Sequence, residues 1–335
     1  MRDRVVQQVI VNIIEPIFDP TFHPSSYGYR PNSQHQAVAK AERFMNKYGL
    51  GHVVDMDLSK CFDTLDHEII IEAISERISD SKVLDLIKKF LKSGVMHRDN
   101  FCETEIGSPQ GGVISPLISN IYLNQFDQKM MDNGIRIVGF ADDILISAKD
   151  KKTAGDYKTY ATKVLEIELK LKVNDMKTKL TSVNEGVAFL GFVIYKRILT
   201  VNSKRIKRFK ENIRRITRRN SGRKLEEIIK ELNPKLRGWI NYYRIANIKG
   251  FIVGFMGWLR RRLRMIKMKQ WKTYKAMHKE MRKLGIKGNG LKMAVTKWKN
   301  SNVHIIHQIL PNKYFEELGL IDIGTYEVGL LSNYY

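Results

Sequence analysis

The segment IRIVGFADDILISA (135–148) contains two apolar, β-branched runs on either side of Ala141-Asp142-Asp143. Runs of this composition that flank a short polar turn predict a β-hairpin. Asp142 and Asp143 would then lie together at the tip, where two adjacent like charges favour recruitment of a cation. The segment therefore predicts a sheet-containing fold with an acidic hairpin tip, although an Asp-Asp pair taken alone is most often ordinary turn chemistry.

A second predicted strand, GHVVDMDL (51–58), also carries carboxylates. Its two-residue alternation places Asp55 and Asp57 on one face and apolar side chains on the other. A carboxylate on an otherwise buried strand is costly unless charged or hydrogen-bonding groups compensate it. Carboxylates gathered from two strands suit Mg²⁺, which takes oxygen ligands and retains waters and substrate phosphates. Two such ions about 4 Å apart can activate a primer 3′-hydroxyl and stabilise a leaving pyrophosphate.

Helical periodicity and breaker residues organise the rest of the chain. The apolar spacing predicts a helix over 1–15, which Pro16 and Pro20 are expected to end. VAFLGFVI (187–194) is expected to be a single strand. After about residue 202 the pattern predicts helices only, with Pro234 separating two of them. Further helices are predicted over 34–48, 66–78, 81–94 and 153–171.

The charge of the chain is divided between its two parts. The 335 residues carry a net charge of +23. Residues 1–186 contain 24 Lys and Arg against 26 Asp and Glu, whereas residues 187–335 contain 34 against 9. A strongly cationic part attached to a neutral one indicates a polyanionic partner, with nucleic acid favoured over an anionic membrane surface. The charge switch and the change to helices together place a domain boundary near 195–202.

Two cysteines exclude a disulfide framework and a tetrahedral zinc site, and they fit a reducing, intracellular compartment. No stretch approaches the roughly 20 apolar residues that span a bilayer, so no membrane association is expected. The basic helices also have apolar stripes that look core-facing instead of lipid-facing.

Six blocks of the sequence form one joint pattern that covers essentially the whole chain. The blocks are RDRVVQQ (2–8) with EPIFDPTF (15–22) and SSYGYRP (25–31), DMDLSKCFDTLDH (55–67), GSPQGGVISPLISNIYLNQFD (107–127), VGFADDILI (138–146), NDMKTKL (174–180) with FLGF (189–192), and LNPKLRGWINYYR (232–244). In this order they resemble the blocks of reverse transcriptases of the bacterial group II intron maturase family, of the type that lacks an endonuclease domain.

The resemblance implies an α+β fold, in which right-hand polymerase fingers and palm are followed by an all-α thumb, or maturase, domain. Residues 1–50 would be partial fingers and residues 51–201 the palm with fingers elements. Residues 202–285 would form the helical thumb, and residues 286–335 a tail that resembles a DNA-binding segment. Family members carry further residues before the RDR block, so the resemblance also implies that this chain lacks an N-terminal fingers segment.

The resemblance assigns the catalytic centre to three aspartates. Asp57, Asp142 and Asp143 would be catalytic and would bind two Mg²⁺ ions, for which Mn²⁺ is a possible substitute. The backbone carbonyl of Leu58 would be an additional ligand.

The resemblance also assigns nucleotide and primer contacts. Phe62 would lie under the incoming sugar and exclude a ribose 2′-hydroxyl, although a core-packing role is the alternative. Gln110 would contact the incoming nucleotide, and Arg4 the triphosphate through a charge-assisted contact. Lys177 would protonate pyrophosphate or hold phosphate, unless it is a solvated lysine. The primer terminus would be positioned by Phe189, Leu190 and Gly191.

Two basic clusters mark the helical part as a nucleic-acid surface. Aromatic residues are interleaved with the clusters, and they are expected mainly to pack the helices together. The clusters are Arg214, Arg215, Arg218 and Arg219 in the helix predicted over 203–219, and Arg260, Arg261 and Arg262 in a later helix.

Two functions follow from these observations. The first is a group II intron reverse transcriptase in the bacterial cytoplasm, with intron RNA, an RNA template and DNA primer, target DNA and deoxynucleoside triphosphates as partners and substrates. The alternative is an RNA-binding maturase, or splicing cofactor, whose polymerase activity is weak or lost through the N-terminal truncation. The three aspartates and Phe62 favour the enzyme, because stabilising an RNA fold requires neither.

Overall fold

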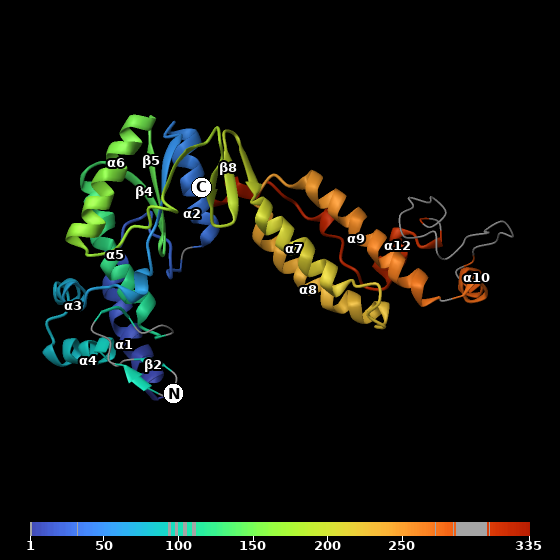
Figure 1. The fold of residues 1–335 in the computed structure, drawn as a ribbon, viewed down its shortest axis with the longest axis horizontal. Helices are drawn as coiled ribbons and strands as arrows, with labels where there is room; N and C mark the ends of the chain where they lie inside the picture. The colour runs from blue at the N-terminus through green and yellow to red at the C-terminus, as the bar shows by residue number, and fades with distance from the viewer. Residues whose placement is uncertain are drawn as a thin grey trace. The chain divides into compact units, whose positions relative to one another are not determined.

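The chain forms two compact units in the computed structural model (Figure 1). Unit 1 comprises Met1–Ile198 and Leu331–Tyr335, and unit 2 comprises Leu199–Leu330. Unit 1 contains 26 Lys and Arg and 26 Asp and Glu, whereas unit 2 contains 32 against 9, so the entire +23 charge belongs to unit 2. The structure describes residues 2–31, 33–92, 95–97, 100–102, 106–108, 112–271, 273–283, 285, 307 and 309–335.

A four-stranded antiparallel sheet, in the order β4-β5-β1-β6, forms the centre of unit 1. The predicted strand at 51–58 and the predicted hairpin at 135–148 are confirmed, and the hairpin places β5 beside β1. The strands are β1 (His52–Asp57), β4 (Arg136–Phe140), β5 (Asp143–Ala148) and β6 (Lys179–Ser182).

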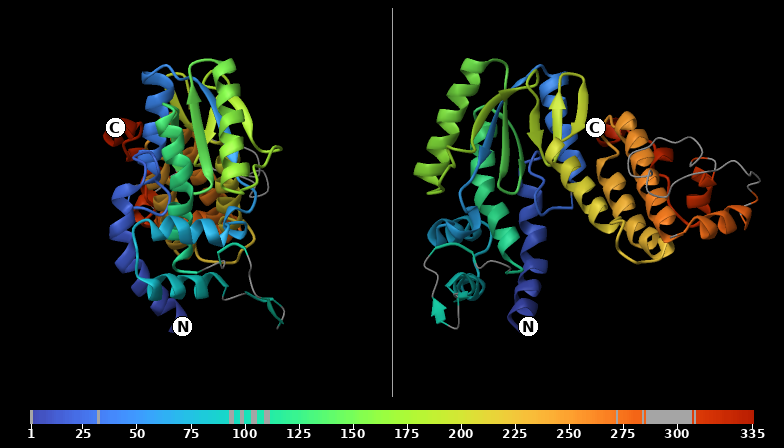
Figure 2. Two further views of the ribbon diagram at one scale, coloured as in Figure 1. Left: turned by 90° about the vertical axis from the view of Figure 1, so that its left-hand side faces the viewer. Right: turned by 45° about the vertical axis from the view of Figure 1, so that its right-hand side comes forward.

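Helices cover both faces of this sheet. On one side lie α5 (Ser115–Asp132) and α6 (Lys151–Lys163), and on the other lies α2 (Gln34–Glu42), as Figures 1 and 2 show. Val54 and Met56 of β1 are fully buried in the core that contains α5 and α6. Because side chains alternate along a strand, Asp55 and Asp57 lie on the opposite face.

Three further helices belong to unit 1. They are α1 (Arg2–Phe18), α3 (His67–Ser75) and α4 (Ser81–Lys92). The first two contact α5, and the third, α4, contacts α3. One face of α1 is buried through Ile10 and Ile14. Another face is apolar and exposed at a spacing of four residues, through Val5, Val9, Ile13 and Ile17.

Two prolines expected to break helices lie inside them. Pro16 is within α1, and Pro234 is within α8 (Leu225–Tyr243). The prediction that Pro16 ends a helix is therefore wrong, as is the separation at Pro234. In each case a buried side chain follows the proline on the same helix, Phe18 in α1 and Leu236 in α8. Burial of these side chains offsets the hydrogen bond that proline removes.

The predicted strand over 187–194 is in fact a hairpin. Its strands are β7 (Val187–Phe189) and β8 (Phe192–Tyr195), with Phe189 opposite Phe192. The two turn residues, Leu190 and Gly191, have φ of 47° and 85°. Positive φ at both positions is the signature of a tight two-residue turn, which the apolar character of the segment conceals. The remaining short elements are β2 (Val95–His97), β3 (Asn100–Cys102), β9 (Ile198–Val201) and helical turns at Asp19–Thr21, Arg43–Lys47, Cys61–Asp63, Val164–Glu168, Ile323–Thr325 and Leu330–Tyr334.

Unit 2 is built from helices around an aromatic core. The rings of Phe209 and Trp239 stack at 4.7 Å, and Phe255 lies 5.0 Å from Phe209. The prediction that the interleaved aromatic residues pack these helices together is confirmed for Trp239. The helices are α7 (Ser203–Ile216), α8, α9 (Lys249–Gln270), α10 (Tyr274–Lys283) and α12 (Asn312–Glu317).

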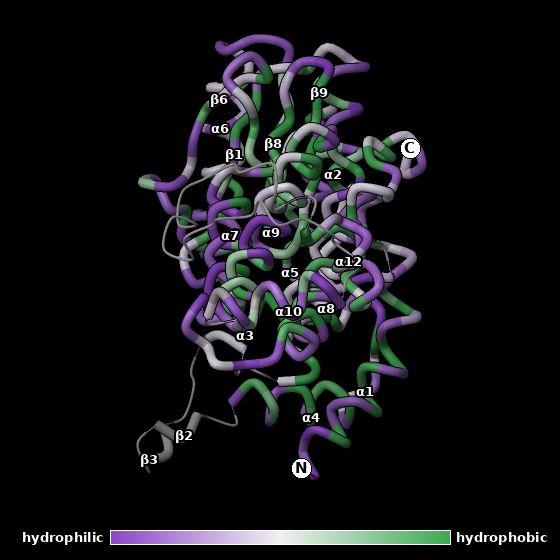
Figure 3. The backbone as a smooth tube through the Cα atoms, turned by 90° about the vertical axis from the view of Figure 1, so that its right-hand side faces the viewer, coloured by the Kyte–Doolittle hydropathy of each residue, from purple (hydrophilic) through white to green (hydrophobic). Residues whose placement is uncertain are grey.

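The surface of α7 is strongly polar, and Figure 3 shows most of this helix in the hydrophilic colour. Only Phe209, Ile213 and Ile216 of α7 are buried. Across the part of the chain that the structure describes, no helix is both long enough and apolar enough to span a bilayer.

Candidate active site

Asp57 and Asp143 face each other across two paired strands. Asp57 is the last residue of β1, Asp143 is the first of β5, and the antiparallel register makes them direct partners. Directly opposed residues point to the same face of a sheet, with Cβ atoms about 4.5–5.5 Å apart. The structure therefore brings together two carboxylates that are 86 positions apart in the sequence.

The third aspartate lies in the turn between β4 and β5. This turn consists of Ala141 and Asp142, and Ala141 has a φ of 55°, a left-handed conformation that is strained for alanine. Gly28 supports the turn from outside, because a Cβ atom at Gly28 would lie 2.2 Å from the backbone nitrogen of Ala141. Asp142 and Asp143 are both exposed, so their carboxylates are accessible to a ligand.

The Asp57 carboxylate is held by two residues of the NDMKTKL segment. Asn174 Nδ2 donates to Asp57 Oδ2 at 3.1 Å, and Lys177 Nζ lies 3.0 and 3.2 Å from the two carboxylate oxygens. The Asn174 backbone N–H also donates to the Asp57 carbonyl at 2.8 Å. Lys177 thus neutralises a carboxylate of the site, a role that its sequence block did not reveal. Asn174 was likewise missed, although it stands in the same block.

Asp55 adds a fourth carboxylate to this face of the sheet. Burial, together with the negative charges of Asp143 and Asp57 and against the attraction of Lys179, raises its pKa to about 6. Repulsion among several carboxylates is the electrostatic condition that a bound cation relieves. The strand alternation had identified Asp55 on the Asp57 face without assigning it a role.

The donor chemistry of this face fits a hard divalent cation. Mg²⁺ is typically held by one or two carboxylates together with waters and substrate phosphates, not by a cage made of protein alone. Among the described residues, no group of three or more His, Cys, Asp or Glu side chains is gathered tightly enough to form such a cage. Leu58, whose carbonyl is a predicted ligand, is buried and its backbone bridges to Val173.

Phe62 lies in the helical turn that follows β1, beside the GSPQGG loop. Its carbonyl accepts a hydrogen bond from the Ser108 N–H at 2.7 Å. Gly107 has a φ of 87°, and a Cβ atom there would lie 2.6 Å from the Asp63 carbonyl oxygen, so only glycine permits this close approach. The loop is thereby anchored to the Phe62 turn. Gln110, the predicted nucleotide contact in the same loop, lies outside the described residues.

The remaining predicted contacts occupy three places in unit 1. Arg4 is exposed on α1, one turn before Gln7, whose side chain accepts a hydrogen bond from the Val113 N–H at 2.7 Å. Leu190 and Gly191 form the β7–β8 turn described above. Phe189 is only 4% exposed, so it packs in the core beneath that turn.

The first basic cluster lies at the C-terminal end of α7, which ends at Ile216 and not at residue 219 as predicted, so Arg218 and Arg219 follow the helix. Arg214, Arg215 and Arg218 are exposed, whereas Arg219 is half-buried. The guanidinium of Arg214 lies 5.6 Å from the centre of the Trp258 ring, a cation–π distance that leaves one guanidinium face open.

The second basic cluster is divided between surface and interior. Arg261 is exposed, but Arg260 is buried and forms an ion pair with Asp322 at 2.5 Å. Arg262 donates to Thr217 Oγ1 at 2.7 Å and to the Thr217 carbonyl at 2.9 Å, so it caps the end of α7. Arg260 and Arg262 therefore make contacts inside unit 2, whereas Arg261 is exposed.

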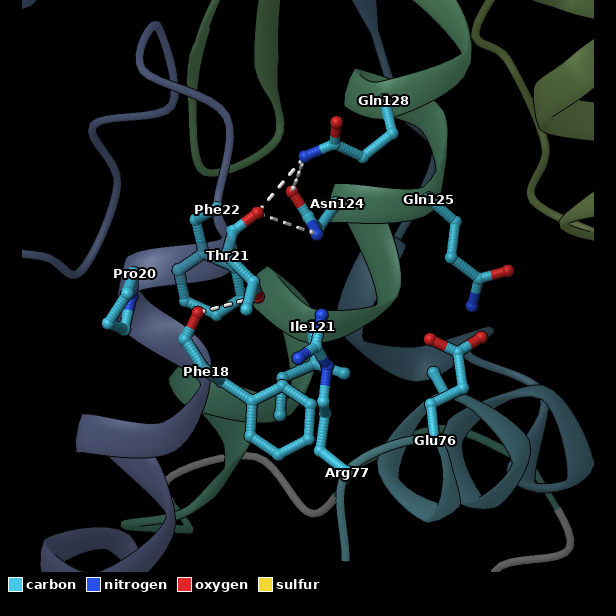
Figure 4. A pocket seen from close by; sticks show the side chains of 11 residues that line it. Phe18, Pro20, Thr21, Phe22, Glu76, Arg77, Ile121, Asn124, Gln125 and Gln128 are labelled. Carbon is cyan, nitrogen blue, oxygen red and sulfur yellow. Dashed lines mark hydrogen bonds between the residues drawn. The ribbon is translucent and has the colours of Figure 1, made fainter.

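A pocket of about 470 Å³ lies elsewhere in unit 1, between the end of α1, α3 and α5 (Figure 4). Its polar wall is the Thr21 carbonyl, which accepts hydrogen bonds from Asn124 and Gln128 at 3.4 and 3.0 Å. No residue of the predicted site lines this pocket.

Comparisons with known proteins match most of the chain. The family described as "Reverse transcriptase (RNA-dependent DNA polymerase)" matches residues 1–194, and "Group II intron, maturase-specific domain" matches residues 206–285. Protein YkfC of Escherichia coli is 33% identical over 229 residues, which cover 57% of this chain and 60% of that protein. Group II intron-encoded protein LtrA of Lactococcus lactis is 38% identical over 127 residues, which cover 38% and 21%.

The chain therefore spans less than two thirds of these relatives' lengths. Among solved structures, a telomerase from Candida tropicalis in complex with a telomeric RNA fragment aligns with 98% of this chain and 52% of its own, with a TM-score of 0.49 and 14% identity.

Proposed function

This chain belongs to the reverse transcriptase (RNA-dependent DNA polymerase) family, and from that premise we propose that it extends a primer on an RNA template with deoxynucleoside triphosphates, as the polymerase of a group II intron. The observation that carries this proposal is the direct opposition of Asp57 and Asp143 at the ends of β1 and β5. Asp142 precedes Asp143 in the hairpin turn, so two strand carboxylates and one turn carboxylate belong to the same end of the sheet.

Asp57, Asp142 and Asp143 would hold divalent metal ions, Mg²⁺ or in its place Mn²⁺, with the Leu58 carbonyl as a further donor. Such ions supply Lewis-acid activation of the primer 3′-hydroxyl and charge neutralisation at the leaving pyrophosphate. Asn174 orients the Asp57 carboxylate through its 3.1 Å hydrogen bond. Lys177, which is 65% exposed as it pairs with Asp57, is free to swing from the carboxylate to a phosphate when substrate enters.

The other predicted residues complete a substrate site in this proposal. Phe62 lies under the incoming sugar, and Gln110 and Arg4 contact the nucleotide and its triphosphate. Phe189, Leu190 and Gly191 position the primer terminus from the β7–β8 hairpin. The surface arginines of unit 2, Arg214, Arg215, Arg218 and Arg261, contact the phosphates of the template–primer and of intron RNA or target DNA.

A second function, RNA binding as a maturase, is supported by a different observation. Unit 2 carries the whole net charge of +23 and contains the match to the maturase-specific domain. A cationic surface of this kind recognises the phosphate backbone and the shape of a folded RNA. RNA binding by unit 2 is compatible with polymerisation by unit 1, because the carboxylates and the arginines belong to different units.

The test is primer extension on an RNA template in Mg²⁺, with RNA affinity measured in parallel. The proposal expects extension by the wild type, loss of extension in Asp142→Asn and Asp143→Asn, and RNA affinity within about twofold of wild type in both, because affinity resides in phosphate contacts. Asp132→Asn is the matched control, since it makes the same chemical change at an exposed position at the end of α5. Substantial extension by Asp143→Asn would refute the assignment of the site.

A further inference from the structure

Tyr29 contacts the proposed sugar-facing ring but has no role in the function described above. Its ring centroid lies 6.0 Å from that of Phe62, and the ring planes meet at 76°. This edge-to-face arrangement is one that aromatic pairs favour. Tyr29 is nevertheless 52% exposed, so its ring borders solvent and is not part of the packed core.

The backbone on either side of Tyr29 is fixed in place. The Tyr27 N–H donates to the Gly139 carbonyl at 2.9 Å, and the Asn120 side chain donates to the Gly28 carbonyl at 2.8 Å. Tyr29 itself has a φ of 54°, a left-handed conformation that is costly for a large side chain. Residues held in such conformations by their neighbours concentrate at functional sites.

The surroundings of Tyr29 connect it to the acidic hairpin tip. Its neighbour Gly28 packs directly on Ala141, the residue before Asp142. Burial raises the pKa of the Tyr29 phenol, and the negative charge of Asp142 raises it further. Tyr29 therefore belongs to the same local environment as the carboxylates, and its loop and the Phe62 turn converge there from different parts of the chain.

We propose that Tyr29 is a positioning residue for sugar selection, and that it acts by fixing the orientation of the Phe62 ring. This inference rests on the proposed polymerase function. An aromatic ring excludes a 2′-hydroxyl only when it is held in one orientation, and the edge of Tyr29 restricts the rotation of the half-buried Phe62 side chain. Without Tyr29 the Phe62 ring is still present, but it can turn aside, so deoxynucleotides are still used while ribonucleotides are excluded less well.

The test measures kcat/KM for a deoxynucleotide and for the matching ribonucleotide in single and double variants. The sugar ratio is the deoxynucleotide value divided by the ribonucleotide value. Tyr29→Ala is expected to lower the ratio by about three- to tenfold, the range that loss of one aromatic contact can supply. Tyr29→Phe keeps the ring and should keep the ratio. Phe62→Val should lower the ratio by itself, and adding Tyr29→Ala to Phe62→Val should change it no further, because coupled residues are not additive.

Tyr48 offers a matched control. It is a tyrosine of unit 1 that is 51% exposed, and its ring lies 5.9 Å from that of Phe44. Tyr48→Ala should leave the sugar ratio unchanged. The proposal is overturned if Tyr29→Ala also leaves the ratio unchanged, or if it lowers the ratio equally in the wild-type and Phe62→Val backgrounds.

A failure of the underlying function would appear differently. If the wild type extends no primer, the polymerase proposal fails. The contact between Tyr29 and Phe62 is then tested by thermal stability, through the melting temperatures of the variants. The melting temperatures of Tyr29→Ala, Phe62→Val and the double variant should be non-additive if the two rings support each other. Additive losses would overturn the positioning role in that case.

Discussion

Replacing Arg214 and Arg215 of α7, together with Arg218 just beyond its C-terminal end, with alanine should weaken RNA binding and make the binding constant less dependent on salt concentration. All three side chains are exposed, so their removal leaves the buried face of the helix intact. Each lost phosphate contact lowers the slope of log K against log salt by about 0.7–0.9, so three contacts lower it by about 2–3. When the lines for wild type and variant meet at 1 M salt, this change in slope gives an affinity loss of about 100- to 500-fold at 0.1 M salt.

The measurement is a filter-binding or fluorescence titration at four or more salt concentrations, using a structured intron RNA. The control is the triple variant Lys149→Ala, Lys151→Ala and Lys152→Ala, which removes the same charge from exposed positions of unit 1. Its slope should stay close to that of the wild type. The reasoning is refuted if the α7 variant retains the wild-type slope, or if both triple variants lose slope equally.

Three further predictions concern single side chains. Burial raises the pKa of Asp127 to about 7, so between about pH 4 and pH 7 the folded state keeps a proton that the unfolded state releases. The free energy of unfolding therefore falls as pH rises through this range. Asp127→Asn should reduce that fall by at most about 4 kcal/mol, as measured by denaturant titrations at several pH values. Lys177→Met removes the cation paired with Asp57. Because exposed ion pairs contribute up to about 1 kcal/mol, the variant should bind Mn²⁺ at most about fivefold more tightly in a titration. Weaker Mn²⁺ binding by the variant would show that Lys177 does not oppose metal binding. Arg262→Met should cost about 1–2 kcal/mol of stability by uncapping α7, whereas the exposed Arg261→Met should cost almost none.

Three strands of the unit 1 sheet, β1, β4 and β5, were predictable because their signals are local, whereas β6 was not predicted. Alternation along 51–58 and the two apolar runs of 135–148 define strands and faces without reference to the rest of the chain. The opposition of Asp57 and Asp143 is different, since it depends on register between strands far apart in the sequence. The pattern of a strand indicates which face each side chain lies on but not which strand pairs with it. The family resemblance, and not the strand pattern, therefore assigned the three aspartates to one site.

The features that sequence patterns did not predict depend on tertiary contacts. Pro16 and Pro234 lie inside helices because buried side chains on both sides of each proline hold the helix together. Arg260, Arg261 and Arg262 look equivalent in the sequence, but Asp322 and Thr217 draw the first and third into unit 2. Neither partner is near them in the sequence, so no local pattern distinguishes the buried arginines from the exposed one.

The contact between Tyr29 and Phe62 has the same origin. SSYGYRP and DMDLSKCFDTLDH were identified as separate blocks, and nothing in either block indicates that their rings meet. The left-handed backbone of Tyr29 and the close packing of Gly28 on the hairpin turn are visible only in the folded chain.

Metal binding can be measured directly at the carboxylates that end β1 and β5. Mn²⁺, detected by electron paramagnetic resonance, is titrated into the protein with an RNA template, a dideoxy-terminated DNA primer and the matching dNTP. If these carboxylates hold the divalent ions of a polymerase site, the wild type binds about two ions in this complex, Asp57→Asn and Asp143→Asn each lose binding, and Asp132→Asn does not. Undiminished Mn²⁺ binding by Asp143→Asn would show that the ions are not held there.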